Sequence, residues 1–351
     1  MRRKELGPDK HVTIKDVAEA AGVSLATASR VLSGRGYASE STRERVNNAI
    51  RELNFRPNEM ARMLTSQHTD SIGLVLKNLV DPYYGHLANG VLDRVHQLGY
   101  HVIVCATDEN EQLEREHIEM LMRQRAAGII AVPTGSNQES WQELINMGVK
   151  TVFIDRQVSG LGDVDTIQVD NVRGAHKAMS YLISLGHSRI GIINGPVYSQ
   201  QYADRLKGYL DALTEAGIKP DQELQENLSS KSEDSTQAIN RLLSLPKRPT
   251  ALFMTNSSIA NSAIFTLREY HLQIPDDISL IIFDDAPLAQ INNPPITVVA
   301  QPMAAIGHLA MEQLDRILKQ SEQQIQQPVQ RIIISPELII RSSCSSPKIK
   351  R

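Results

Sequence analysis

Apolar positions near the start of the chain recur with the period of a helix. Between residues 14 and 21 they fall at i, i+3, i+4 and i+7, on Ile14, Val17, Ala18 and Ala21. Thr13 and Asp16 have the spacing of a capping box at the start of this segment. Gly22 suits the left-handed position that ends a helix. The pattern therefore predicts a short first helix over these residues.

A second short helix is predicted directly after Gly22, with Ser24 as its N-cap. The apolar pattern places Ala28, Val31 and Leu32 inside and leaves Leu25, Ala26, Ser29 and Arg30 on the outer face. A third helix is predicted from about Ser41 to Leu53, with Ser41 and Glu44 as a capping box. Two helices joined by a short turn that contains glycine are typical of a helix-turn-helix, although a plain three-helix bundle fits the same pattern.

From Ser71 onward, short apolar runs alternate with longer amphipathic segments. The runs are SIGLVL, HVIVC, GIIAV, TVFI and TIQVD, then RIGII, TALFM and ISLIIF; the amphipathic segments are 84–97, 111–124, 138–146, 171–185, 201–216, 232–243 and 258–270. Strands that alternate with helices favour βαβ units and parallel sheets. Two such blocks predict two doubly wound α/β subdomains, in which ligands bind outside the carboxyl ends of the strands.

Composition and charge narrow the class of protein. The 351 residues favour two or three domains, and the absence of a run of 18 apolar residues excludes a membrane span. The opening MRRKELGPDKH lacks the apolar stretch of a secretory signal. Residues 1–65 carry 12 Lys and Arg against 8 Asp and Glu, whereas the remainder carries 25 against 32. A basic head on an acidic body favours a polyanion as the partner of the head.

Polar and aromatic side chains stand where the predicted strands end. They are Tyr83 and Tyr84, Asp155 and Arg156, Ser199, Gln201 and Arg205, Asn256, and Phe283 and Asp284. Carboxylates, amides and guanidinium groups beside an aromatic ring suit a polyol. Each residue taken singly is more often a loop residue or a helix cap, so the interpretation depends on their common position at strand ends.

Enzymes of several classes are excluded by the absence of their motifs. No G-x-G-x-x-G follows a first strand, and no G-x-x-x-x-G-K-[ST], nucleophile elbow, H-E-x-x-H or C-x-x-C occurs. We therefore expect no catalytic residue, no cofactor and no metal site.

The head resembles the N-terminal headpiece of the LacI family of transcription regulators. The resemblance rests on TIKDVAEAAGVSLATASRVLSGRG followed by TRERVNNAIRELNFRPNEMARML. It implies that Leu25, Ala26 and Arg30 face base edges, with Arg30 placed for a bidentate contact to guanine. It also implies that Ser24, Thr27 and Ser29 contact phosphates, which position a protein on DNA without reading its sequence.

The segment RPNEMARMLTS, residues 56–66, corresponds to the hinge helix of that family. A helix of about seven residues is unstable alone in water, because nucleation is costly and propagation is short. The resemblance implies that this helix folds against its dimer mate on the operator and inserts Leu64 into the minor groove as an apolar wedge. Thr65 stands where some members carry lysine, which weakens the case for a basic minor-groove contact there.

The body is similar to the type I periplasmic-binding-protein fold that forms the effector domain of the family. The matching blocks are GHSRIGIINGP, RPTALFMTN, IPDDISLIIFDD and PPITVVAQP. They imply effector contacts by Tyr84, Arg156, Ser199, Arg205, Asn256 and Asp284. With Asp155, Gln201 and Phe283, which stand at the same strand ends, these residues form the predicted effector-binding set. In the family an Asp usually follows the residue that matches Asn256, but here Ser257 stands at that position, which leaves the specific sugar open. By the same resemblance, Arg156 favours a sugar over a nucleobase as the effector.

The resemblance also gives the expected domain limits. They are a helix-turn-helix headpiece at 11–56, a hinge helix and linker at 57–70, and an effector-binding and dimerisation domain at 71–343. In this fold the chain crosses between subdomains three times, and we place the crossings near 168–171, 298–302 and 326–330. The first subdomain is then about 71–168 plus 302–327, and the second about 169–299 plus 329–343.

A transport-type binding protein would share this body but lacks a DNA-binding head. We therefore expect a cytoplasmic homodimer that binds double-stranded, near-palindromic operator DNA and a small-molecule effector, most simply a sugar. The expected role is a repressor of a carbohydrate-utilisation operon. A response to a nucleobase or nucleoside, or action as an activator, stays open.

Overall fold

The computed structural model describes residues 12–33, 38–55, 70–162, 164–228, 233–322 and 328–348. The chain divides into two compact units, residues 1–69 and residues 70–351. Within the described ranges, no helix is both long and apolar enough to cross a membrane.

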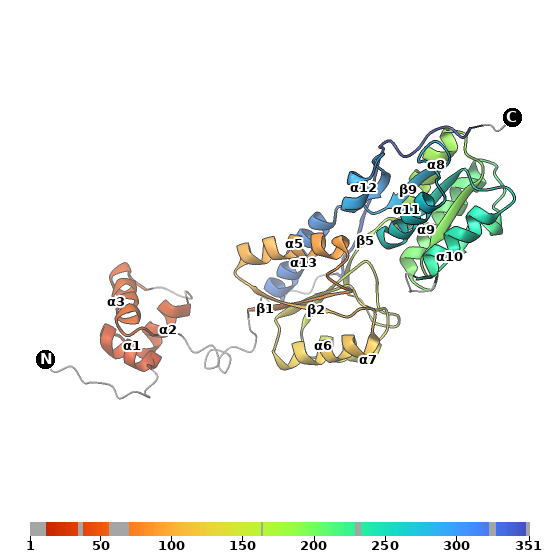
Figure 1. Cartoon of the computed structure of the whole chain (residues 1–351). Helices are drawn as coiled ribbons and strands as arrows, with labels where there is room; N and C mark the ends of the chain where they lie inside the picture. The colour runs from red at the N-terminus through yellow and green to blue at the C-terminus, as the bar shows by residue number, and fades with distance from the viewer. Residues whose placement is uncertain are drawn as a thin grey trace. The chain divides into compact units, whose positions relative to one another are not determined.

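The described part of the first unit, residues 12–33 and 38–55, forms three short helices (Figure 1), α1 (Ile14–Ala21), α2 (Leu25–Ser33) and α3 (Glu40–Glu52). The predicted capping box of α1 is confirmed, because the Thr13 hydroxyl accepts from the Asp16 amide at 3.4 Å and Asp16 Oδ2 accepts from the Thr13 amide at 2.8 Å. Gly22 ends the helix with a φ of 61°, in the left-handed region that was expected.

The start of α3 differs from the prediction. Its N-cap is Ser39, whose hydroxyl accepts from the Thr42 amide at 3.3 Å, so the capping box at Ser41 and Glu44 is wrong. Ser41 already lies in the first turn, where its side chain cannot cap. The three helices enclose a small core that contains Val17, Ala21, Ala28, Val46, Ala49 and Phe55. The alanines in this set allow the short helices to cross closely.

The first subdomain of the second unit contains a six-stranded parallel sheet. In spatial order its strands are β11 (Arg331–Ile334), β5 (Asp165–Val169), β4 (Lys150–Ile154), β3 (Gly128–Ala131), β1 (Ser71–Leu76) and β2 (His101–Ala106). Helices α5 (Pro82–Leu98) and α13 (Met303–Glu322) cover one face, and α6 (Glu111–Arg123) and α7 (Gln138–Asn146) cover the other (Figure 1). A core lies on each side of the sheet, as the continuous apolar strands predicted.

The second subdomain repeats this plan. Its strands, in spatial order, are β12 (Glu337–Ile339), β10 (Thr297–Ala300), β9 (Ser279–Phe283), β8 (Ala251–Met254), β6 (Ile190–Asn194) and β7 (Gln225–Asn227). Among these strands, β12 pairs antiparallel with β10, whereas the other pairings are parallel. The helices are α8 (Asn171–Ser184) and α9 (Gln200–Glu215), α10 (Glu233–Ser244) and α11 (Ser257–Glu269), the short α12 (Pro287–Ile291), and a 3₁₀ turn, η1 (Gln222–Leu224).

Glycine allows the tightest helix crossing of this subdomain. A Cβ at Gly208 of α9 would lie 2.2 Å from the carbonyl oxygen of Val172 in α8 and 2.9 Å from the Ala175 Cβ. Such distances are far below van der Waals contact, so α8 and α9 approach this closely only because position 208 carries no side chain.

The chain passes between the subdomains after β5, after β10 and between β11 and β12. The third crossing therefore lies at Ser335 and Pro336, and the crossing predicted near 326–330 is wrong. Because β11 pairs with β5, residues 331–334 belong to the first subdomain. The two apolar runs on either side of Ser335–Pro336 look alike in sequence, and only their pairing partners separate them.

The three crossings lie next to one another. Val169 at the end of β5 pairs with Ile334 at the end of β11, and Ala300 at the end of β10 pairs with Glu337 at the start of β12. The connection between β11 and β12 therefore begins beside the connection after β5 in the first sheet. It ends beside the connection after β10 in the second sheet.

Candidate functional site

The outer face of α2 has the character that the sequence predicted. Leu25, Ala26, Ser29 and Arg30 are exposed, whereas Ala28 on the opposite face is fully buried. Leu25 keeps 52% of its surface exposed, although a leucine in so small a unit would gain stability from burial. An exposed apolar side chain beside an arginine on one helical face can meet a thymine methyl and a guanine edge respectively.

Two of the predicted phosphate contacts, Ser24 and Thr27, lie at the start of the same helix, whereas Ser29 lies midway along it. The Ser24 hydroxyl accepts from the Thr27 amide at 3.1 Å and lies 2.8 Å from the Thr27 hydroxyl. Both oxygens are at the amino end of α2, where the helix dipole and the unpaired amides favour an anion. The predicted minor-groove wedge, Leu64, and the hinge segment lie outside the described residues.

Two aspartates occupy equivalent positions in the two subdomains. Asp155 follows β4 and Asp284 follows β9, and these strands hold the same place in their sheets. Both residues have a positive φ, 70° and 85°, which costs a residue other than glycine of order 1–3 kcal/mol. Strain of this kind at matching strand ends is typical of functional positions.

The side chains at the two sets of strand ends are close enough to interact. Burial first, then the charges of Asp155, Tyr84 and Asp284, raise the pKa of Tyr83 well above its ordinary value. Tyr83 also donates to Asp155 Oδ2 at 3.0 Å, and its ring meets Tyr84 edge to face at 4.8 Å. We call this group the interlobe site; its members are Tyr83, Tyr84, Asp155, Arg156, Ser199, Gln201, Tyr202, Arg205, Asn256, Phe283, Asp284 and Gln301.

Arg205, from α9, is held on several sides. Its Nε donates to Asn171 Oδ1 at 2.8 Å and its Nη1 donates to the Thr255 carbonyl. The guanidinium carbon lies 3.7 Å from the centre of the Phe283 ring, in cation–π geometry. The side chain is 3% exposed, so it is fixed before any ligand arrives. A group held in this way loses little entropy on binding.

Asp284 lies opposite this arginine and is partly buried. Burial raises its pKa from the ordinary 3.8 to about 6, although Arg205 and a hydrogen bond from Gln301 Nε2 lower it. The charges of Asp81 and Asp155, both from the first subdomain, raise it further. The carboxylate thus lies in an environment that disfavours its charge, as ligand-binding carboxylates often do.

Several buried polar atoms of the interlobe site have no hydrogen-bond partner within the described part of the chain. They are Ser199 Oγ, Gln201 Oε1, Arg156 Nε and Gln301 Oε1. An unpaired buried polar atom costs roughly 1–3 kcal/mol, and such atoms are rare unless water or a ligand completes them. Ser199 holds the N-cap position of α9 without capping it, so its hydroxyl is available for another partner.

Asn256 has a structural task as well. Its Oδ1 accepts from the Ile259 amide at 2.8 Å, which caps α11, and its Nδ2 donates to the Tyr202 hydroxyl at 2.9 Å. Both ends of the amide are therefore engaged, and the side chain forms part of the wall of the interlobe site.

The sequence interpretation missed three residues at or next to this site. Gln301 follows β10 and Glu109 follows β2, so the strand-end rule alone could have found both. Tyr202 lies 5.7 Å from the Arg205 guanidinium, one helical turn before it on α9, and the spacing of three residues was the available signal.

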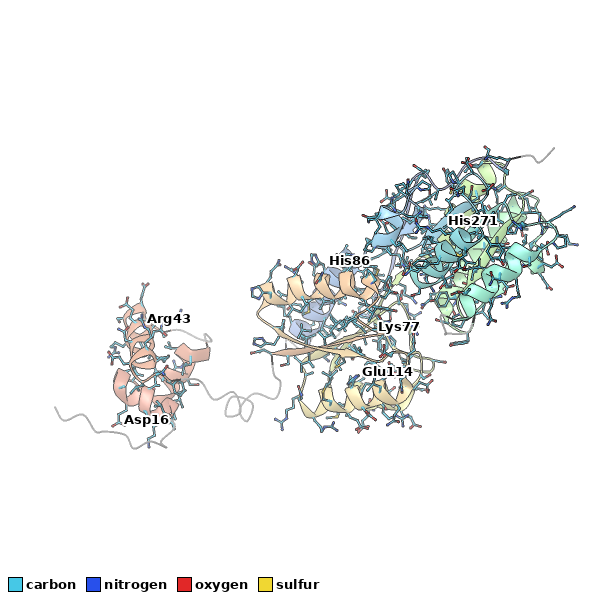
Figure 2. The ribbon with its side chains drawn as sticks, in the orientation of Figure 1. Asp16, Arg43, Lys77, His86, Glu114 and His271 are labelled. Atoms are coloured by element: carbon cyan, nitrogen blue, oxygen red, sulfur yellow. The ribbon has the colours of Figure 1, made fainter. Side chains whose placement is uncertain are left out.

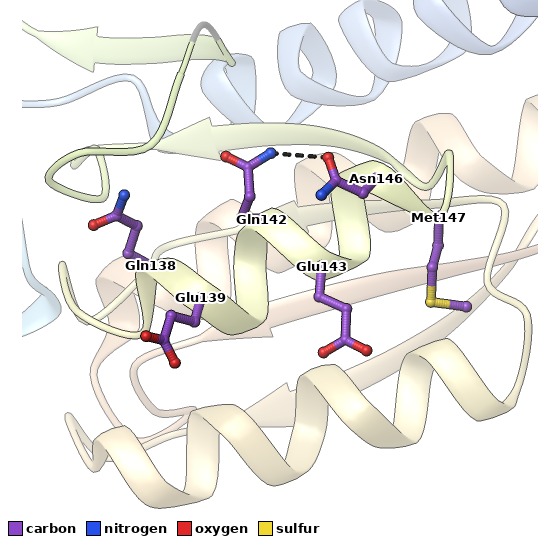
Figure 3. A pocket seen from close by; sticks show the side chains of 6 residues that line it. All are labelled: Gln138, Glu139, Gln142, Glu143, Asn146 and Met147. Carbon is purple, nitrogen blue, oxygen red and sulfur yellow. Dashed lines mark hydrogen bonds between the residues drawn. The ribbon is translucent and has the colours of Figure 1, made fainter.

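A hollow of about 490 Å³ lies elsewhere, along the surface of α7 (Figure 3). It is lined by side chains of this helix and its C-cap residue: Gln138, Glu139, Gln142, Glu143, Asn146 and Met147. None of the predicted site residues lines it, and it is open to solvent, so we do not regard it as the ligand site.

Comparison with known proteins identifies both units. Residues 13–58 match the family described as bacterial regulatory proteins, lacI family, and residues 179–344 match the periplasmic binding protein-like domain. The chain is 33% identical over 340 residues to the HTH-type transcriptional regulator DegA of Bacillus subtilis (strain 168), covering 95% of this chain and 98% of DegA.

Two further relatives extend the match. The ribose operon repressor of Escherichia coli (strain K12) is 35% identical over 334 residues, covering 94% of this chain and 99% of the repressor. The structure of the Lac repressor dimer bound to operator and the anti-inducer ONPF has a TM-score of 0.79 and 26% identity, covering 96% of this chain and 100% of that one. The predicted fold and family are confirmed: the chain belongs to the LacI family of bacterial transcription regulators, with a helix-turn-helix unit followed by a periplasmic-binding-protein-like unit.

Proposed function

We propose that this regulator is a cytoplasmic dimeric repressor of a carbohydrate-utilisation operon, whose affinity for a near-palindromic operator is set by a sugar bound in the interlobe site. The observation that carries the effector assignment is the set of buried polar atoms on Arg156, Ser199, Gln201 and Gln301 that have no hydrogen-bond partner among the described residues. A polyol offers a donor and an acceptor on every hydroxyl, so one molecule can complete donors and acceptors together.

The aromatic rings favour a sugar over a nucleobase. A base needs a flat ring face to stack on, but the Arg205 guanidinium lies 3.7 Å above the Phe283 ring. Tyr83 and Tyr84 meet edge to face, with their ring planes at 79°, and so form an angled wall instead of a slot.

The exposure of Leu25, Ala26, Ser29 and Arg30 on the outer face of α2 supports a DNA-binding role for this face. Arg30 would contact a guanine, and Leu25 and Ala26 would make apolar contacts, while Ser24, Thr27 and Ser29 would bind phosphates. A unit that reads one half-site needs a two-fold mate, which is why we infer a homodimer. In that dimer, paired hinge segments would place Leu64 in the minor groove.

The switch follows from where the site residues originate. Arg205 and Asp284 belong to the second subdomain, whereas Tyr84 and Arg156 belong to the first. One ligand that contacts both sets fixes the angle between the subdomains, and it changes operator affinity only if it binds one angle better than the other. For a coupling of about 1–3 kcal/mol, operator affinity changes roughly 5- to 150-fold.

The test is a fluorescence-anisotropy titration of an operator selected from random DNA, at fixed salt, with a panel of pentoses, hexoses, disaccharides and nucleobases. We expect one sugar to change operator affinity, and Arg205→Ala and Asp284→Ala to abolish that change while binding without ligand stays within a few-fold of wild type.

Arg241→Ala is the matched control, because Arg241 forms a bidentate ion pair with Glu226 outside the interlobe site. A normal response in both site variants would place the effector elsewhere. A response to nucleobases alone would establish the alternative effector class.

A further inference from the structure

The guanidinium of Arg156 is already occupied by a carboxylate of the same chain. Its Nη2 donates to Glu109 Oε1 at 2.6 Å and its Nη1 donates to Glu109 Oε2 at 2.9 Å, the bidentate geometry that also recognises phosphate. Nη1 donates in addition to the Thr134 carbonyl at 3.4 Å. Nε, which is buried and has no partner within the described residues, is the donor that a ligand can still use.

The loop that carries Glu109 is bent in a costly way. Asp108 and Glu109 follow β2 with φ values of 48° and 59°; aspartate visits this left-handed region readily, but glutamate does so at a cost of roughly 1–2 kcal/mol. This backbone places the Glu109 carboxylate against Arg156, although β2, which Glu109 follows, lies three positions from β4 in the sheet. The strained backbone thus holds a negative charge against this arginine.

A second cation shares the same carboxylate. Lys77, at the carboxyl end of β1 (Figure 2), lies with its Nζ 3.3 Å from Glu109 Oε1. Burial acts to raise the pKa of Glu109, but hydrogen bonds and charge from Arg156, and then Lys77, outweigh burial and lower it. Glu109 is thus ionised at neutral pH, and one carboxylate serves two cations.

The other side of Arg156 is held by a buried network. Glu114, on α6 (Figure 2), is fully buried and accepts from the Thr134 amide at 2.8 Å and the Thr134 hydroxyl at 2.7 Å. It also accepts from Asn137 Nδ2 at 2.8 Å. These bonds fix the Thr134 carbonyl against Arg156, so the guanidinium cannot easily turn away from Glu109.

We propose that Glu109 determines the charge selectivity of the interlobe site. Its carboxylate takes the place against Arg156 and Lys77 that a phosphate or carboxylate of a ligand would occupy, so the site accepts an uncharged sugar and rejects sugar phosphates and sugar acids. This inference rests on the proposed function, because it concerns the ligand of the same site. A second anion about 5 Å from Glu109 would bind roughly ten- to a hundredfold more weakly than if that charge were absent.

The test uses Glu109→Gln in the full chain and inorganic phosphate as the probe, with binding measured by calorimetry at constant ionic strength. We expect this variant to bind phosphate at least about tenfold more tightly than wild type, because Arg156 and Lys77 are no longer neutralised. Glu109→Asp, which keeps the charge, should resemble wild type. Adding Arg156→Gln to Glu109→Gln should remove the gain, which locates the phosphate.

Glu226→Gln is the matched control, since Glu226 forms the same bidentate contact with Arg241, at 2.9 and 2.6 Å, away from this site. If Glu109→Gln fails to fold, Glu109→Ala gives the same readout without an amide facing Lys77. Equal phosphate binding by wild type and the neutral variant, or an equal gain in Glu226→Gln, would overturn the role of Glu109.

Ribose and ribose 5-phosphate, titrated into wild type and Glu109→Gln, separate this inference from the proposed function. A wild type that takes ribose and a variant that gains the phosphate ester support both. An Arg156-dependent gain in phosphate affinity without ribose binding in either form supports the role of Glu109 and excludes ribose as the effector, while a failure of every sugar in the operator titration would contradict the sugar assignment. Ribose binding without any gain in phosphate affinity supports the sugar assignment and contradicts the role of Glu109.

Discussion

Asp284 should cost the protein stability at neutral pH, and Asp284→Asn should recover it. Burial raises the pKa of this carboxyl from 3.8 to about 6. A shift of about two pKa units corresponds to roughly 3 kcal/mol. Because Asp284 is only partly buried, water screens part of this cost, and we expect a gain of about 1–2 kcal/mol. Asparagine tolerates the positive φ of this position and can still accept from Gln301.

The sign of the effect depends on pH in a defined window. The ionised form is the one that burial disfavours, so the penalty is fully present above the folded-state pKa near 6 and vanishes below the unfolded-state value of 3.8. Asp284→Asn should therefore stabilise the chain at about pH 7.5 and leave it nearly unchanged at about pH 3.5. Wild type should itself gain this contribution as the pH falls through 6.

Urea unfolding followed by circular dichroism and by the fluorescence of Trp141, which is fully buried and the sole tryptophan, measures the difference. Asp276→Asn is the control, because Asp276 is exposed and its ion pair with Lys348 at 3.3 Å should contribute little. An Asp284→Asn variant that is less stable than wild type at about pH 7.5, or equally shifted at both pH values, would refute the reasoning.

Three further changes test the headpiece and the packing. Arg30→Ala should weaken operator binding by roughly 1–3 kcal/mol per half-site and relax the preference at one base pair, and an equal loss on all sequences in a binding titration would make Arg30 a phosphate contact instead. Thr13→Ala should lower headpiece stability by about 1 kcal/mol in thermal unfolding, through loss of the capping box; an unchanged midpoint would mean that the cap contributes nothing. Gly208→Ala should cost at least roughly 1–3 kcal/mol in urea unfolding because its Cβ would meet the Val172 carbonyl at 2.2 Å, whereas Gly85→Ala, with open space around it, should cost nothing.

The sequence predicted the strands and helices of both subdomains because their apolar runs are long and regular. It also placed Asp155, Arg156 and Asp284 at strand ends, and the structure brings them together. What it could not supply is the pairing of Arg156 with Glu109, since these residues are 47 positions apart and no local period links them. Nor could it assign residues 331–334 to a sheet, because which strand an apolar run pairs with is decided by tertiary contacts.

The N-cap of α3 could not be predicted correctly for a different reason, because several residues near its start are good caps. Ser39, Ser41 and Thr42 lie within four residues of one another, and each can start a helix. The Ser41–Glu44 spacing matched a capping box, yet the Ser39 hydroxyl reaches the Thr42 amide and extends the helix by about half a turn. Local rules place such an element reliably but leave its first residue undecided.

The side-by-side arrangement of the three crossings limits the mechanical freedom of the second unit. The three connections run side by side and form a narrow ribbon between the subdomains. They are held together by the pairing of Val169 with Ile334 in one sheet and of Ala300 with Glu337 in the other. Such a ribbon bends easily out of its plane but resists shear within its plane. The motion open to the two subdomains therefore approximates rotation about one axis, which runs across the width of the ribbon. Different effectors would then differ in a single quantity, the angle at which each holds the ribbon, and could be ranked as a graded series of strong and weak agonists.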